Sequence, residues 1–137
     1  MDYSKLSDFE INKAVAIANG LQVQGIDDSK AIGMTSKYHE LRPHTVWVSD
    51  GENPWEQYAP TLCWEDAGPI LTSNKISLMW MTEEKQWCAW ANGELEEGCW
   101  EWKYCPDDYS QGDNPLRAAM IVFLMMQESA NVQDNPA

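Results

Sequence analysis

The feature that most constrains this fold is a segment near the C-terminus, residues 114–126, in which Arg117 is the lone charged side chain. Asp113 or Asn114 can cap a helix at its start, and Pro115 suits the first helical position. A helix that is apolar on every other face must be covered on all sides, and this one is shorter than the about 20 residues needed to span a bilayer. The segment is therefore either the central helix of a small domain or a helix partly covered by another chain.

Length and charge narrow the class of protein. A chain of 137 residues fits one domain with a real hydrophobic core. The net charge of −13 comes from 9 basic and 22 acidic residues. A nucleic-acid binder needs a basic surface, so we expect no direct contact with DNA or RNA. The first residues do not resemble a signal peptide and no segment has transmembrane length, so we expect a cytoplasmic protein without membrane contact.

The motifs that usually mark catalysis or metal binding are missing from the sequence. The four cysteines are Cys63, Cys88, Cys99 and Cys105. Their spacing contains no Cys-x-x-Cys pair, so free thiols are favoured over a zinc site shared with His39 and His44. The histidines are best explained as part of a solvated segment, with metal binding or acid–base chemistry as the alternative. With no phosphate-binding glycine motif or Ser/His/Asp set, we expect no enzyme activity, no metal and no cofactor.

The N-terminal part of the chain predicts a helix. Ser7 and Glu10 form a capping box, and Asn19-Gly20 supplies a C-terminal stop. Apolar residues between these signals recur at helical spacing, and Asn12 falls outside their stripe.

The middle of the chain carries weaker signals. Residues 21–37 indicate a short helix or a turn, and residues 44–48 indicate a strand. Residues 52–74 are rich in proline and predict a long irregular loop. Its aromatic residues include Trp55, Tyr58 and Trp64. Such a loop either covers the core with its tryptophans or is functional.

Residues 75–105 predict a β-meander of three strands. A turn at residues 82–85 separates the first two strands, and Asn92-Gly93 signals a tight hairpin before the third. The third strand covers residues 94–105, and a polar loop at residues 106–113 leads into the apolar helix. Trp100, Trp102 and Tyr104 share one face of this third strand, which makes them candidates for covering the helix.

These elements predict an α+β fold. We expect a single domain over residues 1–130, in which an antiparallel β-meander of about four strands packs against the N-terminal helix and the apolar C-terminal helix. Residues 131–137 are expected to form a flexible tail. The apolar helix has more surface than one sheet face can cover, so a homodimer is also predicted.

Three blocks of the sequence resemble the NinX-type proteins of lambdoid bacteriophages. The blocks are Leu6-Ser7-Asp8-Phe9-Glu10-Ile11-Asn12-Lys13-Ala14-Val15-Ala16, then Tyr58-Ala59-Pro60 with Trp64, Gly68-Pro69-Ile70-Leu71 and Ile76-Ser77-Leu78, and finally Asn114-Pro115-Leu116-Arg117-Ala118-Ala119-Met120. Their order and spacing cover most of the chain. The chain departs from the family's usual pattern at Ala67-Gly68-Pro69, where two glycines are usual, and at Asn114-Pro115, where Thr-Pro is usual. The resemblance implies a phage or prophage origin in a cluster of small accessory genes, and it implies no established reaction, cofactor or catalytic residue.

The surface of the chain suggests how such a protein works. Candidate interaction residues are the aromatic and charged side chains Trp55, Tyr58, Trp64, Asp66, Glu94, Glu96, Glu97, Glu101 and Arg117. Acidic residues dominate between 83 and 113, and such a face can steer a basic partner or can simply keep the protein soluble. Arg117 is expected to pair with a carboxylate such as Asp66, either to stabilise the fold or to anchor an interface.

Two functions follow from these observations. The first is a non-enzymatic interaction module in the bacterial cytoplasm that binds a host or phage protein with a basic surface. The second is a small-ligand domain that binds a sugar or a planar aromatic molecule on a tryptophan-rich face.

Overall fold

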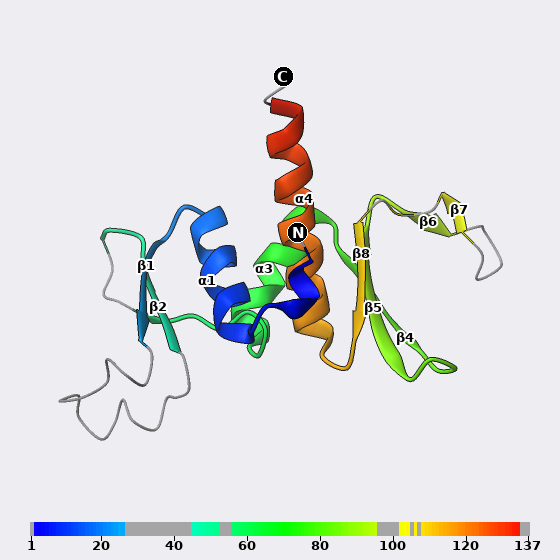
Figure 1. Ribbon diagram of the computed structural model, residues 1–137, viewed down its shortest axis with the longest axis horizontal. Helices are drawn as coiled ribbons and strands as arrows, with labels where there is room; N and C mark the ends of the chain where they lie inside the picture. The colour runs from blue at the N-terminus through cyan, green and yellow to red at the C-terminus, as the bar shows by residue number, and fades with distance from the viewer. Residues whose placement is uncertain are drawn as a thin grey trace. The chain divides into compact units, whose positions relative to one another are not determined.

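The computed structural model describes residues 2–26, 45–52, 56–95, 102–104, 106 and 108–134, and it describes the side chains of 2–23, 46–52, 56–93, 106 and 108–130. The chain divides into two compact units, Met1–Ala59 (unit 1) and Pro60–Ala137 (unit 2). Each unit combines helices with antiparallel strands (Figure 1), so the predicted α+β class is confirmed. That residues 1–130 form a single domain stays a prediction.

The described residues of unit 1 form two helical elements and three strands. They are η1 (Tyr3–Lys5), α1 (Asp8–Ala18), β1 (Gln22–Ile26), β2 (Thr45–Ser49) and β3 (Glu56–Gln57). The strands pair in the order β1-β2-β3 and are all antiparallel. Strand β2 confirms the strand predicted at residues 44–48, within the described residues. Strand β1 was not expected, because its polar residues gave no clear period and it forms by pairing with β2.

Helix α1 begins and ends at the predicted signals. The Ser7 hydroxyl oxygen accepts a hydrogen bond from the Glu10 N–H at 3.1 Å, and Gly20 adopts a φ of +78° just after the helix. The prediction that Asn12 points away from the core is wrong, since only 6% of it is exposed. Ile11, Asn12, Val15 and Ala16 are all buried, so α1 buries two adjacent rows of side chains rather than one stripe.

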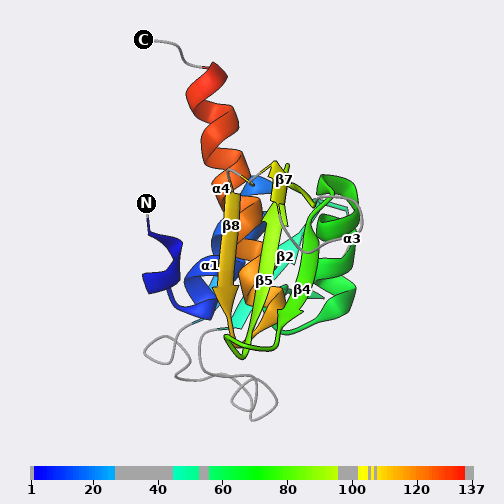
Figure 2. The same ribbon diagram turned by 90° about the vertical axis from the view of Figure 1, so that its right-hand side faces the viewer.

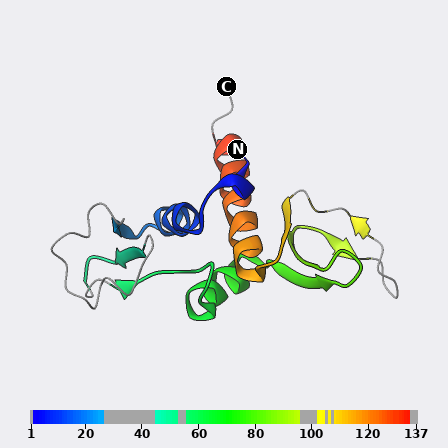
Figure 3. The same cartoon turned by 60° about the horizontal axis from the view of Figure 1, so that its bottom comes forward.

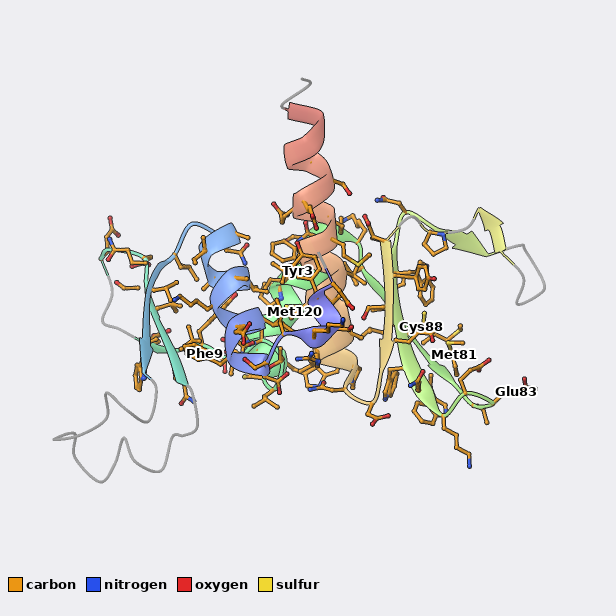
Figure 4. All side chains as sticks on the ribbon, in the orientation of Figure 1. Tyr3, Phe9, Met81, Glu83, Cys88 and Met120 are labelled. Carbon is orange, nitrogen blue, oxygen red and sulfur yellow. The ribbon has the colours of Figure 1, made fainter. Side chains whose placement is uncertain are left out.

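The core of unit 1 forms between α1 and its sheet. Ala16, Val46 and Val48 are buried together, and Phe9, Leu21, Val23 and Tyr58 pack against them. Figure 3 shows α1 beside the β1-β2-β3 sheet, and Figure 4 shows Phe9 on the sheet side of α1. The Tyr58 N–H donates to the Val46 carbonyl oxygen at 2.8 Å. Tyr58 is therefore a half-buried structural residue rather than an exposed contact.

In unit 2, two helices and five strands are described. They are α3 (Trp64–Asn74), β4 (Ser77–Met81), β5 (Gln86–Ala91), β6 (Glu94–Leu95), β7 (Trp102–Tyr104), β8 (Asp108–Gly112) and α4 (Pro115–Asp134). The described part of the chain thus has eight strands, against about four predicted. None of its helices is both long enough and apolar enough to cross a membrane.

The main sheet of unit 2 is not the predicted meander. Its order is β4-β5-β8, and β6 and β7 pair only with each other, on the side away from α4 (Figures 1 and 3). The prediction that Asn92-Gly93 forms a hairpin between β5 and the next strand is therefore wrong, because β5 pairs with β8 and β6 pairs with β7. Gly93 is needed for another reason: a Cβ added there would lie 2.9 Å from the Cβ of Pro106. Gly93 follows β5 and Pro106 precedes β8, so the two ends of the connection between these strands touch at this point, where a larger side chain would not fit.

The segment predicted as a polar loop at 106–113 contains strand β8. Its residues Tyr109 and Gln111 are exposed and give no apolar signal. The strand forms because all five residues of Asp108–Gly112 pair with residues 87–91 of β5.

The predicted irregular stretch at 52–74 contains helix α3. Pro69 lies inside this helix, and it lacks the N–H that would donate one turn back. The helix persists because Ala67 and Ile70 are buried on one face. The Thr72 hydroxyl also donates to the Gly68 carbonyl oxygen at 3.0 Å, next to the proline.

Helix α4 is covered as its sequence requires. Leu116 and every residue from 118 to 124 are buried. Within unit 2, α4 packs against β5 and β8, more lightly against β4, and against α3 (Figure 2). The helix runs to Asp134, so it takes in the first part of the tail predicted at 131–137.

The face of the sheet that lies toward α4 carries several small residues. Ala89 and Ala91 of β5 share one face with Ser110 and Gly112 of β8, as the strand register shows. Figure 4 shows Met81 and Cys88 on the opposite face, away from α4. The cover predicted from Trp100, Trp102 and Tyr104 falls on side chains outside the described ones.

Asn114 caps α4 and ties it to a distant segment. Its side-chain oxygen accepts from the N–H groups of Leu116 and Arg117 at 2.9 and 3.2 Å. Its side-chain nitrogen donates to the Thr61 carbonyl oxygen at 2.7 Å. The predicted cap is thus confirmed, and it also holds the turn that precedes α3.

We expect the change Asn114→Ala to destabilise unit 2 measurably. Loss of the cap costs about 1 kcal/mol, and loss of the donor to buried Thr61 costs about 1–2 kcal/mol more. The matched change Asn114→Asp keeps the cap and loses only the donor, so it should cost about 1 kcal/mol less than Asn114→Ala. Urea unfolding monitored by circular dichroism measures both changes. Equal stability of Asn114→Ala and the wild type would contradict this role.

Candidate functional site

One end of unit 2 is marked by the last row of residues that crosses all three strands of the central sheet, one residue pair before β4 ends at Met81. Trp80 of β4 pairs with Trp87 of β5, and Trp87 pairs with Gly112 of β8. The two indole rings meet edge to face, with centroids 5.6 Å apart and planes at 64°. The 82–85 turn lies just beyond this row. Figure 2 shows β4 and β8 ending, and α4 beginning, at this same end.

The hydrogen bond of Asn114 brings the start of α3 to the same end. Asn114 follows Gly112 by two residues, and its amide holds the Thr61 carbonyl oxygen. Leu62 is the next residue, and Trp64 is the first residue of α3. Residues far apart in the sequence therefore meet at one place through the strand register and one side-chain hydrogen bond.

This end exposes large apolar side chains. Leu62 is 70% exposed, Trp64 58% and Trp80 46%, while Trp87 is half-buried. We call these four residues the aromatic end. A few exposed apolar residues are normal, but several in one place are typical of a surface that binds something.

Acidic residues surround the aromatic end. The exposed ones are Glu65, Glu83, Glu84 and Asp113. Among the described residues at this end, Lys85 is the one exposed cation. The end therefore has a negative potential around an apolar centre.

Asp66 and Arg117 lie in the first turns of α3 and α4, and both are half-buried. The contact of Asn114 with Thr61 places these two first turns at the same end of unit 2. The ion pair between them stays a prediction that this placement allows.

The predicted interaction residues do not form one site. Trp64, Asp66 and Arg117 come together at one end of unit 2, and Tyr58 belongs to the core of unit 1. Glu94 lies in β6, but its side chain is not among the described ones. Outside the described residues are Trp55, Glu96, Glu97 and Glu101.

The candidates predicted from the sequence include Trp64 but not the other three members of the aromatic end, Leu62, Trp80 and Trp87. Leu62 carried no signal, because a single leucine in a proline-rich stretch is unremarkable. Trp80 was assigned to an alternating strand, and its exposure follows from its place at the end of edge strand β4.

The histidines and cysteines considered for metal binding form no cluster within the part of the chain that the structure describes. No three His, Cys, Asp or Glu residues lie close enough there to hold a metal ion. His39, His44, Cys99 and Cys105 fall outside it. Cys63 and Cys88 are free thiols. Burial raises the pKa of the Cys88 thiol, and a hydrogen bond with Gln111 only partly offsets this rise.

Comparison with known proteins places this α+β chain among phage proteins. Its sequence matches the family described as "Bacteriophage P22, NinX" over residues 2–127. The chain therefore belongs to the NinX family, which confirms the resemblance seen in three blocks of its sequence. No curated protein matches the chain.

A double-mutant cycle tests the predicted pair of Asp66 and Arg117. We expect Asp66→Asn and Arg117→Met to destabilise the protein singly, and the double change to cost less than the sum. The coupling between half-buried partners should be about 1 kcal/mol, and it should shrink in 1 M salt. Urea unfolding of the four proteins measures it. Strict additivity would show that the two side chains do not interact.

Thiol alkylation tests the burial of Cys88. We expect iodoacetamide at pH 8 to modify half-buried Cys63 well before buried Cys88, because a raised pKa leaves less reactive thiolate at a given pH. Peptide mapping by mass spectrometry separates the two sites, with urea-unfolded protein as the control. Faster modification of Cys88 in the folded protein would contradict its placement.

Proposed function

We propose that this NinX-type protein is a non-enzymatic phage accessory protein that acts by binding a host or phage protein with a basic surface. The proposal is carried by one observation: exposed Leu62, Trp64 and Trp80 sit among exposed acids at one end of unit 2. The bacterial cytoplasm is where such a partner would be met.

The energetics favour a protein partner for this surface. Burying a large apolar side chain contributes about 1.5–3 kcal/mol, so three exposed ones can supply much of a binding free energy. Tryptophan is among the residues that most often dominate protein interfaces. The surrounding acids add a faster encounter with a basic partner rather than much affinity.

The excess of acids over the whole chain supports the same partner. The net charge of −13 repels nucleic acids and acidic proteins alike. The proposal assigns no catalytic residue, metal or cofactor to the chain.

The alternative is a small-ligand domain that binds a sugar or a planar aromatic molecule. Exposed Trp64 and Trp80 favour it, because indole rings stack on such ligands. However, Trp80 and Trp87 meet at 64° and form an angled surface rather than a flat one. Quenching of tryptophan emission by a sugar or planar-compound library would support this alternative over the protein partner.

Charge reversal tests the role of the acids. We expect the pair Glu83→Lys and Glu84→Lys, exposed at the aromatic end, to slow association with the protein captured by the tagged wild type from lysate of phage-infected bacteria at low salt. The effect should shrink as salt rises, because screening weakens the attraction. The pair Glu52→Lys and Glu56→Lys, exposed in unit 1, gives the same net charge and is the matched control.

Equal slowing by both pairs would show that only the net charge acts. Unchanged association in both would contradict electrostatic recognition. Failure of the wild type to retain any protein would contradict the proposed function itself.

A further inference from the structure

We infer that the aromatic end of unit 2 is the docking surface, and that its occupant is a partner-protein segment with an apolar anchor flanked by lysine or arginine. This inference rests on the proposed function and deepens it by naming the surface and the chemistry of the partner.

The backbone that carries the aromatic end is anchored by strand pairing and by a hydrogen bond. Trp80 and Trp87 are fixed by strand pairing, and their rings contact each other. Leu62 and Trp64 follow a turn whose Thr61 carbonyl accepts from Asn114. Because these side chains project from anchored backbone, little conformational entropy is lost when a partner covers them.

The apolar centre calls for an apolar anchor in the partner. Three of the five large hydrophobic residues that are exposed in the described chain, Leu62, Trp64 and Trp80, belong to this end. The other two are Ile17 of unit 1 and Tyr109 of β8. Among the described residues of unit 2, exposed large hydrophobic side chains therefore gather at the aromatic end, and Tyr109 is the one found elsewhere.

The charges select a cationic segment. Exposed Glu65, Glu83, Glu84 and Asp113 lie beside exposed Lys85, the one exposed cation described at this end. Lysine or arginine in the partner can pair with these carboxylates, and an arginine can also stack on an indole ring for about 0.5–1 kcal/mol. A second copy of this chain would bring the same acids against each other, so charge complementarity disfavours it.

Tyr109 provides a matched control within the same unit. It is 55% exposed, close to the 58% of Trp64. It pairs with Trp90, which pairs with Ser77, so it lies toward the opposite end of the sheet. Its side chain also falls on the face shared by Cys88 and Met81, away from α4 (Figure 4).

The test compares substitutions at the two ends. We expect Trp64→Ser and Leu62→Ser each to weaken retention of the captured protein at least tenfold, and Tyr109→Ser to leave it within twofold of wild type. Thermal unfolding of each variant, alone, checks that its fold is intact. Leu62, 70% exposed in a turn, remains informative if Trp64→Ser weakens α3.

Photo-crosslinking identifies the occupant. The photoreactive residue p-benzoylphenylalanine replaces Trp64 in one protein and Tyr109 in the other, and both are irradiated in lysate of infected bacteria. We expect crosslinks from position 64 to a peptide that has lysine or arginine around an apolar residue, and weak or no crosslinks from position 109.

Each other result overturns the inference. Retention by Trp64→Ser and Leu62→Ser at the wild-type level would move docking elsewhere while leaving the proposed function in place. Crosslinks from position 64 to a second copy, or to an acidic segment, would replace the occupant. A wild-type protein that retains no partner would overturn the proposed function and this inference with it.

Discussion

The apolar circumference of α4 is the constraint on which unit 2 depends. Leu116 and residues 118–124 are all buried, so the unit must place structure around the helix rather than on one side of it. The sheet meets this need with a face that carries buried Ala89 and Ala91 of β5. Helix α3 packs on α4 as well. The order β4-β5-β8 follows, because β8 must return beside β5 before the chain enters α4.

Asn114 links this packing to the surface. The same side chain that caps α4 holds the Thr61 carbonyl oxygen, and so it brings Leu62 and Trp64 to the end where Trp80 and Trp87 close the sheet. Stability and the candidate binding surface therefore depend on one amide group. In this arrangement the acids at 65, 83, 84 and 113 come from three separate stretches of chain and lie at the same end of unit 2 as the apolar side chains.

The sequence predicted the parts of the fold that local signals determine. The capping box of α1, the cap and burial of α4 and the turn at 82–85 depend on neighbouring residues. Helix α3 was missed because Pro69 breaks the local pattern, and β8 because its polar residues take their conformation from pairing with β5. Trp64, Asp66 and Arg117 were named as candidates, but their meeting with Trp80 depends on strand register and on a hydrogen bond between residues 61 and 114. Neither the strand register nor this long-range hydrogen bond can be predicted from a periodic pattern in the sequence.

Unit 2 of this NinX-type phage protein presents an apolar surface among acidic side chains, and we propose that a partner protein binds there. Hydroxyl-radical footprinting tests it most directly, on the tagged protein alone and in the complex it forms in lysate of infected bacteria. The account predicts that Leu62, Trp64 and Trp80 lose reactivity in the complex while Tyr109 keeps it. Protection of Tyr109 with undiminished reactivity at Leu62 and Trp64 would contradict it.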